Sequence, residues 1–211
     1  MISNRDDQRM IGDYVVLNSL KIGLKEIVIG ENINALLGER YLCCFAESQT
    51  VFEYYEDAVV SDNYSEIVKV FGERIRDSAT EMLKEQELAE KTIGDDSELF
   101  MDKCDSIRPD DCIQNKVIVI NGKVLRPEYR RASMQLMLCT GGFGSQPNAR
   151  GRTCYCISLY DGKKTCFYRS DALGTIEPEK LPEWAKAGLE RAKEIAANEK
   201  IPKTKERDEA R

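Results

Sequence analysis

Three glycines and two arginines in one short stretch are the residues whose types and spacing point most directly to chemistry. The stretch begins with Gly141, Gly142 and Gly144 and ends with Arg150 and Arg152. Glycines adopt positive φ angles at little cost, so their backbone N–H groups can converge on an anion. Arginine binds phosphate or carboxylate through two parallel hydrogen bonds. The stretch is therefore a candidate anion- or nucleic-acid-binding loop.

Three further arginines, Arg126, Arg130 and Arg131, precede this loop and extend the candidate site. The loop lacks the Gly-Lys-Ser/Thr ending of a P-loop, and its glycine spacing does not match the dinucleotide-binding fingerprint. One alternative is a hairpin loop whose arginines lie in solvent or pair with acidic residues elsewhere. Another is an enzyme that holds a phosphorylated ligand in a pocket beside residues 141–144.

Histidine is absent from all 211 residues of the sequence. Its absence removes the commonest general base, the usual partner of a nucleophilic serine or cysteine, and every histidine-containing metal site. We therefore expect neither a triad-type hydrolase nor a zinc protease. The expectation is a non-enzymatic protein without catalytic residues, cofactor or metal.

The eight cysteines include three, Cys154, Cys156 and Cys166, that lie close in sequence. A two-residue turn at residues 161–162 would place Ile157 opposite Cys166. Cross-strand partners share a face of the sheet, so Cys154 and Cys156 would lie on the other face, where they could not bind one ion together with Cys166. Buried free thiols are the main expectation; structural zinc, a disulfide or a redox role are the alternatives.

Acidic side chains concentrate in the first half of the chain. Residues 1–115 carry 12 basic and 25 acidic side chains, a formal charge of −13, whereas residues 116–169 carry ten basic and two acidic ones, a charge of +8. A folded acidic surface can occupy a groove meant for nucleic acid. The alternative is that these acidic residues provide solubility and neutralise the basic stretch. The candidate partner-binding residues are Glu66, Glu73, Asp77 and Glu81.

Apolar runs with turn residues between them predict the elements that carry these side chains. Runs within residues 14–55 are short, partly β-branched and separated by residues such as Gly23 and Gly30, which predicts strands. From residue 64 to residue 90, apolar side chains recur at steps of three and four, which predicts one long amphipathic helix. All four candidate acidic residues lie on this helix.

The second half repeats the order of strands followed by a helix. Asn121-Gly122 and Asp161-Gly162 predict two tight hairpins, and Pro178 marks the start of a closing helix. The sequence therefore predicts an α+β protein of two small modules, each with antiparallel strands followed by an amphipathic helix. The expected parts are an acidic module (12–91), a linker (92–112), a basic module with the glycine-rich loop (113–199) and a disordered tail (200–211).

No apolar run approaches the roughly 20 residues that span a bilayer, and the N-terminal residues lack the pattern of a signal peptide. We therefore expect a cytoplasmic protein with reduced thiols and no membrane partner.

Several motifs resemble a family of uncharacterised proteins from gut Firmicutes. These proteins are encoded on mobile genetic elements, namely conjugative elements, plasmids and phages. The motifs cover most of residues 14–190 and are Leu20–Gly23, Val59–Tyr64, Leu125–Arg131, Gly141–Gly144, Ala149–Arg152 and Lys180–Ala185. The family has no assigned activity to transfer to individual residues. Because such elements commonly encode inhibitors of host defence, the resemblance implies an anti-CRISPR protein directed against Cas9.

Two functions follow as expectations. In the first, the acidic module binds a basic groove of a host nuclease such as Cas9, while the arginines contact phosphate or guide RNA. In the second, the protein binds DNA or RNA for the transfer or replication of its element. Aromatic residues interleave the basic stretch, among them Tyr155 and Tyr168, and exposed aromatic rings on basic strands can stack single-stranded bases.

Overall fold

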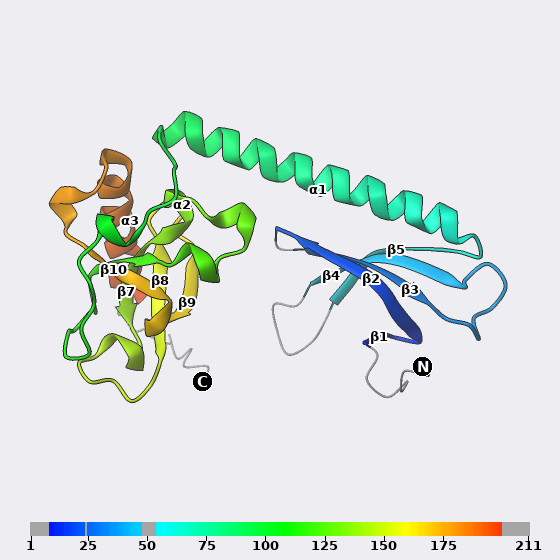
Figure 1. Ribbon diagram of the computed structural model, residues 1–211, viewed down its shortest axis with the longest axis horizontal. Coiled ribbons are helices and arrows are strands. Elements are labelled where there is room, and N and C mark those ends of the chain that lie inside the picture. The colour runs from blue at the N-terminus through cyan, green and yellow to red at the C-terminus, as the bar shows by residue number, and fades with distance from the viewer. Residues whose placement is uncertain (1–8, 24, 48–53, 200–211) are drawn as a thin grey trace, which may run out of the picture. The chain divides into compact units, whose positions relative to one another are not determined.

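The computed structural model describes residues 9–23, 25–47 and 54–199. It contains two five-stranded antiparallel sheets and helices that follow them in the chain, so the predicted α+β fold is confirmed (Figure 1). The chain divides into two compact units, unit 1 (residues 1–88) and unit 2 (residues 89–211). The tail predicted for residues 200–211 lies outside the described residues.

Unit 1 contains a meander in which each strand pairs with the next one in the chain. The strands are β1 (Met10–Ile11), β2 (Tyr14–Ile22), β3 (Lys25–Glu31), β4 (Tyr41–Glu47) and β5 (Tyr54–Ser61). The two apolar runs that the sequence separates within residues 14–22 form the single strand β2. Its pairing with β3 shifts register between Val16 and Asn18, which leaves Leu17 as the extra residue of a bulge, while Asn18 and Ser19 pair with Ile29 and Val28.

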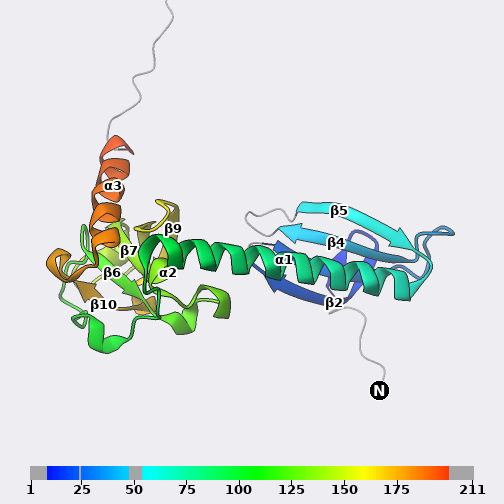
Figure 2. The same ribbon diagram turned by 90° about the horizontal axis from the view of Figure 1, so that it is seen from above.

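Helix α1 (Tyr64–Ile93) covers one face of this sheet, as two views show (Figure 1, Figure 2). Its apolar stripe buries Ile67 against Ile27, Ile29 and Cys43. The helix predicted for residues 64–90 is therefore confirmed. The other face of the sheet buries a second cluster that includes residues of β1, β2, β3 and β4.

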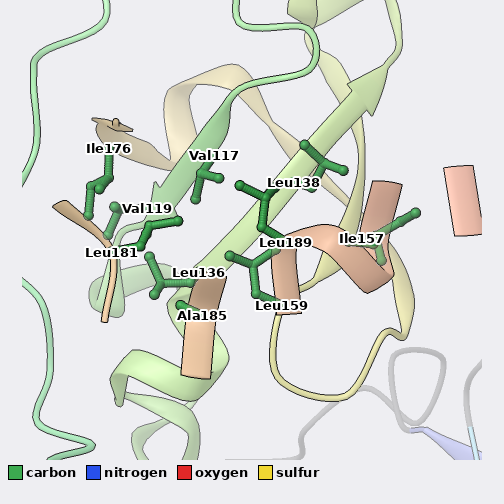
Figure 3. Packing of buried hydrophobic residues seen from close by; sticks show 11 residues of the cluster. Val117, Val119, Leu136, Leu138, Ile157, Leu159, Ile176, Leu181, Ala185 and Leu189 are labelled. Carbon is green, nitrogen blue, oxygen red and sulfur yellow. The ribbon is translucent and has the colours of Figure 1, made fainter. Parts of the chain in front are cut away.

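Unit 2 contains a sheet with the strand order β10-β6-β7-β8-β9. The strands are β6 (Val117–Ile120), β7 (Leu136–Gly141), β8 (Thr153–Ser158), β9 (Lys164–Tyr168) and β10 (Ala172–Ile176). A single helical turn, α2 (Ala132–Gln135), precedes β7, and helix α3 (Glu183–Glu199) follows β10. Ala185 and Leu189 of α3 pack on Leu136, Leu138 and Ile157 of the sheet (Figure 3).

Two local predictions in unit 2 are wrong. Asn121-Gly122 does not form a hairpin: the Asn121 side chain accepts a hydrogen bond from the Lys123 N–H at 3.0 Å and caps a 3₁₀ turn. The next strand, β7, begins only at Leu136 and pairs with β6 across this longer connection, and β10 pairs with the other edge of β6. Pro178 begins a 3₁₀ turn rather than the closing helix, which starts after Pro182.

The β8–β9 hairpin has a longer connection than predicted. Tyr155, not Ile157, lies opposite Cys166. The register differs from the expected one by two residues, and an even shift leaves every side chain on its face. Cys154 and Cys156 therefore lie on the opposite face from Cys166, as predicted.

The acidic segment 92–112 packs on unit 2 rather than forming a free linker. Asp96 accepts hydrogen bonds from the Ser133 backbone N–H at 2.6 Å and its hydroxyl at 2.7 Å. Gln135 exchanges two hydrogen bonds with the backbone of Leu99, at 2.7 and 2.9 Å. With this segment included, unit 2 carries 22 basic and 20 acidic residues, a formal charge of only +2, and unit 1 carries 9 and 17, a charge of −8.

None of the helices in the described part of the chain combines the length and apolar character that crossing a bilayer requires.

Candidate anion-binding cleft

Arg131, one of the predicted anion ligands, is a buried residue of unit 2. Its side chain is almost inaccessible, and its Nε lies 3.8 Å from a carboxylate oxygen of Asp96. Its Nε and Nη1 atoms are buried without a hydrogen-bond partner. A buried charge is costly unless an opposite charge compensates it, so Arg131 depends on Asp96. Arg131 is therefore not available to a ligand at the surface.

Arg130 and Arg126 also make contacts within unit 2. The Arg130 Nε donates to the carbonyl oxygens of Gly122 and Leu125 at 3.0 and 3.2 Å, which fixes the turn after β6. The Arg126 guanidinium lies 3.7 Å from the Glu128 carboxylate. The predicted cluster of three arginines thus does not converge on one open site.

The predicted glycine loop is a tightly packed turn. A Cβ atom at Gly142, whose φ is +96°, would clash with the carbonyl oxygen of Thr153, and one at Gly144 would clash with that of Arg152. These glycines allow the loop to lie directly against the start of β8. Packing therefore accounts for Gly142 and Gly144, whereas anion binding by the loop amides stays a prediction.

Arg152 lines a cleft of about 710 Å³ together with two arginines that the sequence analysis did not select, Arg108 and Arg169. The lining comes from the segment before β6, the loop before β8, the turn after β9 and the start of β10. Asn148 adds a polar group, and Ile107 and Leu173 add apolar surface. No carboxylate is among the described residues that line the cleft.

Arg169 is fixed in this cleft by three backbone carbonyl groups. Its Nη1 donates to Gly144 at 3.0 Å, and its Nη2 donates to Arg108 at 2.7 Å and to Asp111 at 2.9 Å. Carbonyl oxygens are neutral, so these bonds orient the guanidinium and leave its positive charge uncompensated. Arg169 therefore makes the cleft electropositive and holds the glycine loop beside the segment that carries Arg108.

Arg108 and Arg152 are exposed, and within the described ranges neither side chain forms a hydrogen bond or an ion pair. Arg150 is also exposed and lies on the same loop as Arg152, but it does not line the cleft. Two unpaired guanidinium groups beside a third, fixed one suit a phosphate, because each can donate two parallel hydrogen bonds to it.

The lining residues favour binding over acid–base chemistry. General acid–base catalysis needs a group that gains or loses a proton near neutral pH, and arginine stays protonated. Elsewhere in unit 2, hydrogen bonding to Cys139 and burial raise the pKa of the Cys154 thiol, which keeps it protonated and unreactive. All eight cysteines are free thiols, and among the described residues no group of metal-binding side chains is arranged to hold an ion.

Three of the four acidic candidates form one row on α1. Glu73, Asp77 and Glu81 are exposed and follow each other at four-residue steps, which places them on one side of the helix; we call them the acidic stripe. Glu73 lies 3.9 Å from Lys69, and Asp77 lies 2.9 Å from Arg76. Ion pairs this exposed contribute little, so the stripe remains open to a partner.

Glu66 has a structural role that the sequence analysis missed. Its carboxylate accepts a hydrogen bond from the Ser61 hydroxyl at 2.7 Å, and it lies in the first turn of α1. The Asn63 side chain caps the same turn by accepting from the Ser65 N–H at 3.0 Å. A carboxylate at a helix N-terminus stabilises the helix dipole. The spacing of Ser61, Asn63 and Glu66 was the available signal for this cap.

Comparison of the chain with protein-family models, with curated proteins and with solved structures found no match. A function must therefore be argued from the cleft and the acidic stripe.

Proposed function

We propose that the protein is an accessory protein of a mobile genetic element that binds and inhibits a nucleic-acid-guided host nuclease of the Cas9 type. The proposal rests on one observation: the surface exposes both positively and negatively charged side chains that a partner can reach. Arg108 and Arg152 are exposed cations without a partner in the described chain, and the acidic stripe is an exposed anionic row. A guided nuclease offers the complement of both, a basic channel and a phosphate backbone.

The cleft supports contact with nucleic acid. Its three guanidinium groups face no lining carboxylate, and Arg169 is already oriented by its three carbonyl partners. A preorganised donor loses little conformational freedom when the phosphate arrives. We therefore expect the cleft to bind a phosphate of guide or target strand.

The acidic stripe supports contact with the nuclease protein. Carboxylates repeated along a helix approximate a row of phosphates and are attracted to a groove lined by lysine and arginine. Occupation of that groove excludes the nucleic acid that the nuclease must bind, which would inhibit cleavage without any chemical step.

The test is a pull-down of guide-loaded Cas9 by the full-length protein, followed by a DNA-cleavage assay. We expect wild-type protein to bind and to reduce cleavage. Charge reversal of the stripe (Glu73→Lys, Asp77→Lys, Glu81→Lys) should abolish both effects, whereas Lys123→Glu, a reversal at an exposed residue of unit 2, should not. Absence of binding together with undiminished cleavage would refute the proposal.

A second candidate function is binding of DNA or RNA without a protein partner, for transfer or replication of the element. The carboxylate-free lining of the cleft favours it. Fluorescence anisotropy with single-stranded DNA and RNA at low salt tests it. Binding that Arg108→Glu and Arg152→Glu abolish, and that Lys123→Glu retains, would support this function; no anisotropy change with wild-type protein would exclude it.

A further inference from the structure

The loop between β3 and β4 exposes three large aliphatic side chains within five residues. Ile33 is 62% exposed, Leu36 is 76% exposed and Leu37 is 97% exposed. We call these three residues the apolar tip. Single exposed aliphatic residues are common on protein surfaces, but a group of them on one projecting loop typically marks an interaction site.

Hydrogen bonds to neighbouring elements hold this loop in one conformation. The two carboxylate oxygens of Asp62 accept from the backbone N–H groups of Gly38 at 2.7 Å and Arg40 at 3.2 Å. The Tyr14 hydroxyl donates to the Glu39 carbonyl oxygen at 2.7 Å. These anchors flank the tip on its C-terminal side and keep it out of the core. Little ordering is then needed when a partner covers it.

The loop projects from the end of the sheet at which α1 begins (Figure 1, Figure 2). Asp62, which anchors the loop, directly precedes the capped first turn that carries Glu66. The nearby cation Arg40 is paired with Glu31 at 2.8 Å. The apolar tip therefore lies in acidic surroundings, in a unit whose formal charge is −8.

This charge distinguishes among possible occupants. Anionic lipid headgroups would be repelled by the acidic residues around the tip. A second copy of unit 1 would bring the same negative charge and would also be repelled. A protein pocket with an apolar floor and a rim of lysine and arginine complements both the tip and its surroundings.

We propose that the apolar tip is a docking anchor that inserts into an apolar pocket with a basic rim on a protein partner. The proposal rests on the proposed function, because it takes the guided nuclease as that partner. An aliphatic anchor that fills a pocket at the centre of an interface, with a polar rim around it, is an arrangement that gives specific binding. The acidic stripe directs the encounter, and the tip determines how long the complex lasts.

The test measures the affinity of full-length protein for guide-loaded Cas9 by biolayer interferometry. Leu36→Ser with Leu37→Ser should weaken binding about tenfold or more, mainly through faster dissociation. The matched control is Leu83→Ser, which removes a leucine of α1 that is 59% exposed. We expect the control to bind within about twofold of wild type, since substitutions outside the centre of an interface have small effects. Circular dichroism checks that each variant is folded.

Each outcome decides between the two proposals. If wild-type protein does not bind the nuclease, the proposed function fails and this inference fails with it. If wild-type and tip variants bind equally, only the inference fails. Sedimentation velocity and flotation with phosphatidylcholine–phosphatidylglycerol vesicles test the other occupants. Self-association or vesicle binding that the tip substitutions abolish would also overturn the inference.

Discussion

The two units share an architecture and differ in what their charged residues do. Each consists of a five-stranded antiparallel sheet with a helix packed on one face. In unit 2, Arg130 and Arg169 donate to backbone carbonyl oxygens and Arg131 lies beside Asp96. Only part of the positive charge of this unit is therefore accessible to a partner. In unit 1, the acidic stripe lies on the surface of α1. The formal charge of a stretch of sequence therefore overstates the charge that a partner can reach.

The largest expected effect concerns the buried pair of unit 2. Asp96→Ala removes the carboxylate that compensates Arg131 and accepts from Ser133. Breaking a buried ion pair leaves an uncompensated charge, so we expect a loss of about 3–5 kcal/mol in the free energy of unfolding. Urea denaturation followed by circular dichroism measures it. The control is Asp102→Ala, which removes an exposed carboxylate of the same segment. If Asp96→Ala were as stable as wild type, Arg131 would have to reach solvent. The contrast between internal charges in unit 2 and surface charges in unit 1 would then be lost.

This pair also shows where sequence reasoning stopped. The apolar period of α1 predicted that helix, because one buried face of a helix imposes a local repeat. The short apolar runs of β2, β3 and β4 predicted those strands, because apolar side chains on both faces of the sheet are buried. The segment 92–112 has no such repeat, since Asp96 is held by the backbone N–H and hydroxyl of Ser133 and Leu99 by the side chain of Gln135, both in α2. Polar tertiary contacts leave no periodic signal, so the sequence predicts a linker where the structure has a packed segment.

The candidate site was predicted only in part for the same reason. Arg152 was selected from its place beside the glycines. Arg108 and Arg169 are separated by 61 residues and meet only in the folded unit, where the Arg169 side chain donates to the Arg108 carbonyl oxygen. A stretch of basic residues does not reveal which side chains will bind carbonyl groups and which will remain open.

The second prediction compares an arginine of unit 2 that bonds to its own backbone with one whose side chain is exposed. Arg169→Ala leaves three carbonyl groups without their donor, so we expect a loss of about 1–3 kcal/mol in stability. Arg152→Ala is the matched control and should change stability by less than about 0.5 kcal/mol, because its side chain makes no contact of this kind in the described chain. Thermal denaturation compares them. Equal effects of the two substitutions would contradict the assignment of one arginine to the fold and the other to the surface.

The third prediction concerns the partly buried ion pair between Arg9 and Glu26 of unit 1. Two hydrogen bonds from Arg9, at 2.6 and 3.0 Å, lower the pKa of Glu26. A lowered pKa in the folded state adds stability above the ordinary carboxyl pKa, and this stability is lost as the pH falls through the lowered value. Because the pair is partly exposed, Arg9→Ala should cost about 0.5–1 kcal/mol at neutral pH.

The difference between wild type and Arg9→Ala should shrink as Glu26 becomes protonated in acid. Urea denaturation at a series of pH values measures it. Lys69→Ala, which breaks a more exposed ion pair of 3.9 Å, should show almost no effect at any pH. A constant difference between wild type and Arg9→Ala across the series would mean that Arg9 acts through packing rather than through the charge of Glu26.

The smallest effect is expected at the acidic stripe, and it has the opposite sign. Like charges at four-residue steps destabilise a helix by about 0.2–0.5 kcal/mol per pair. Replacing Glu73 and Glu81 by Gln and Asp77 by Asn should therefore leave unit 1 as stable as wild type or slightly more stable at low salt. The gain should vanish at about 1 M salt, where the Debye length is about 3 Å. Thermal denaturation at both salt concentrations measures it. If the neutral substitutions destabilise the protein, the stripe contributes to the fold, as the arginines of unit 2 do. Unchanged or higher stability is expected if the stripe is a surface for a partner.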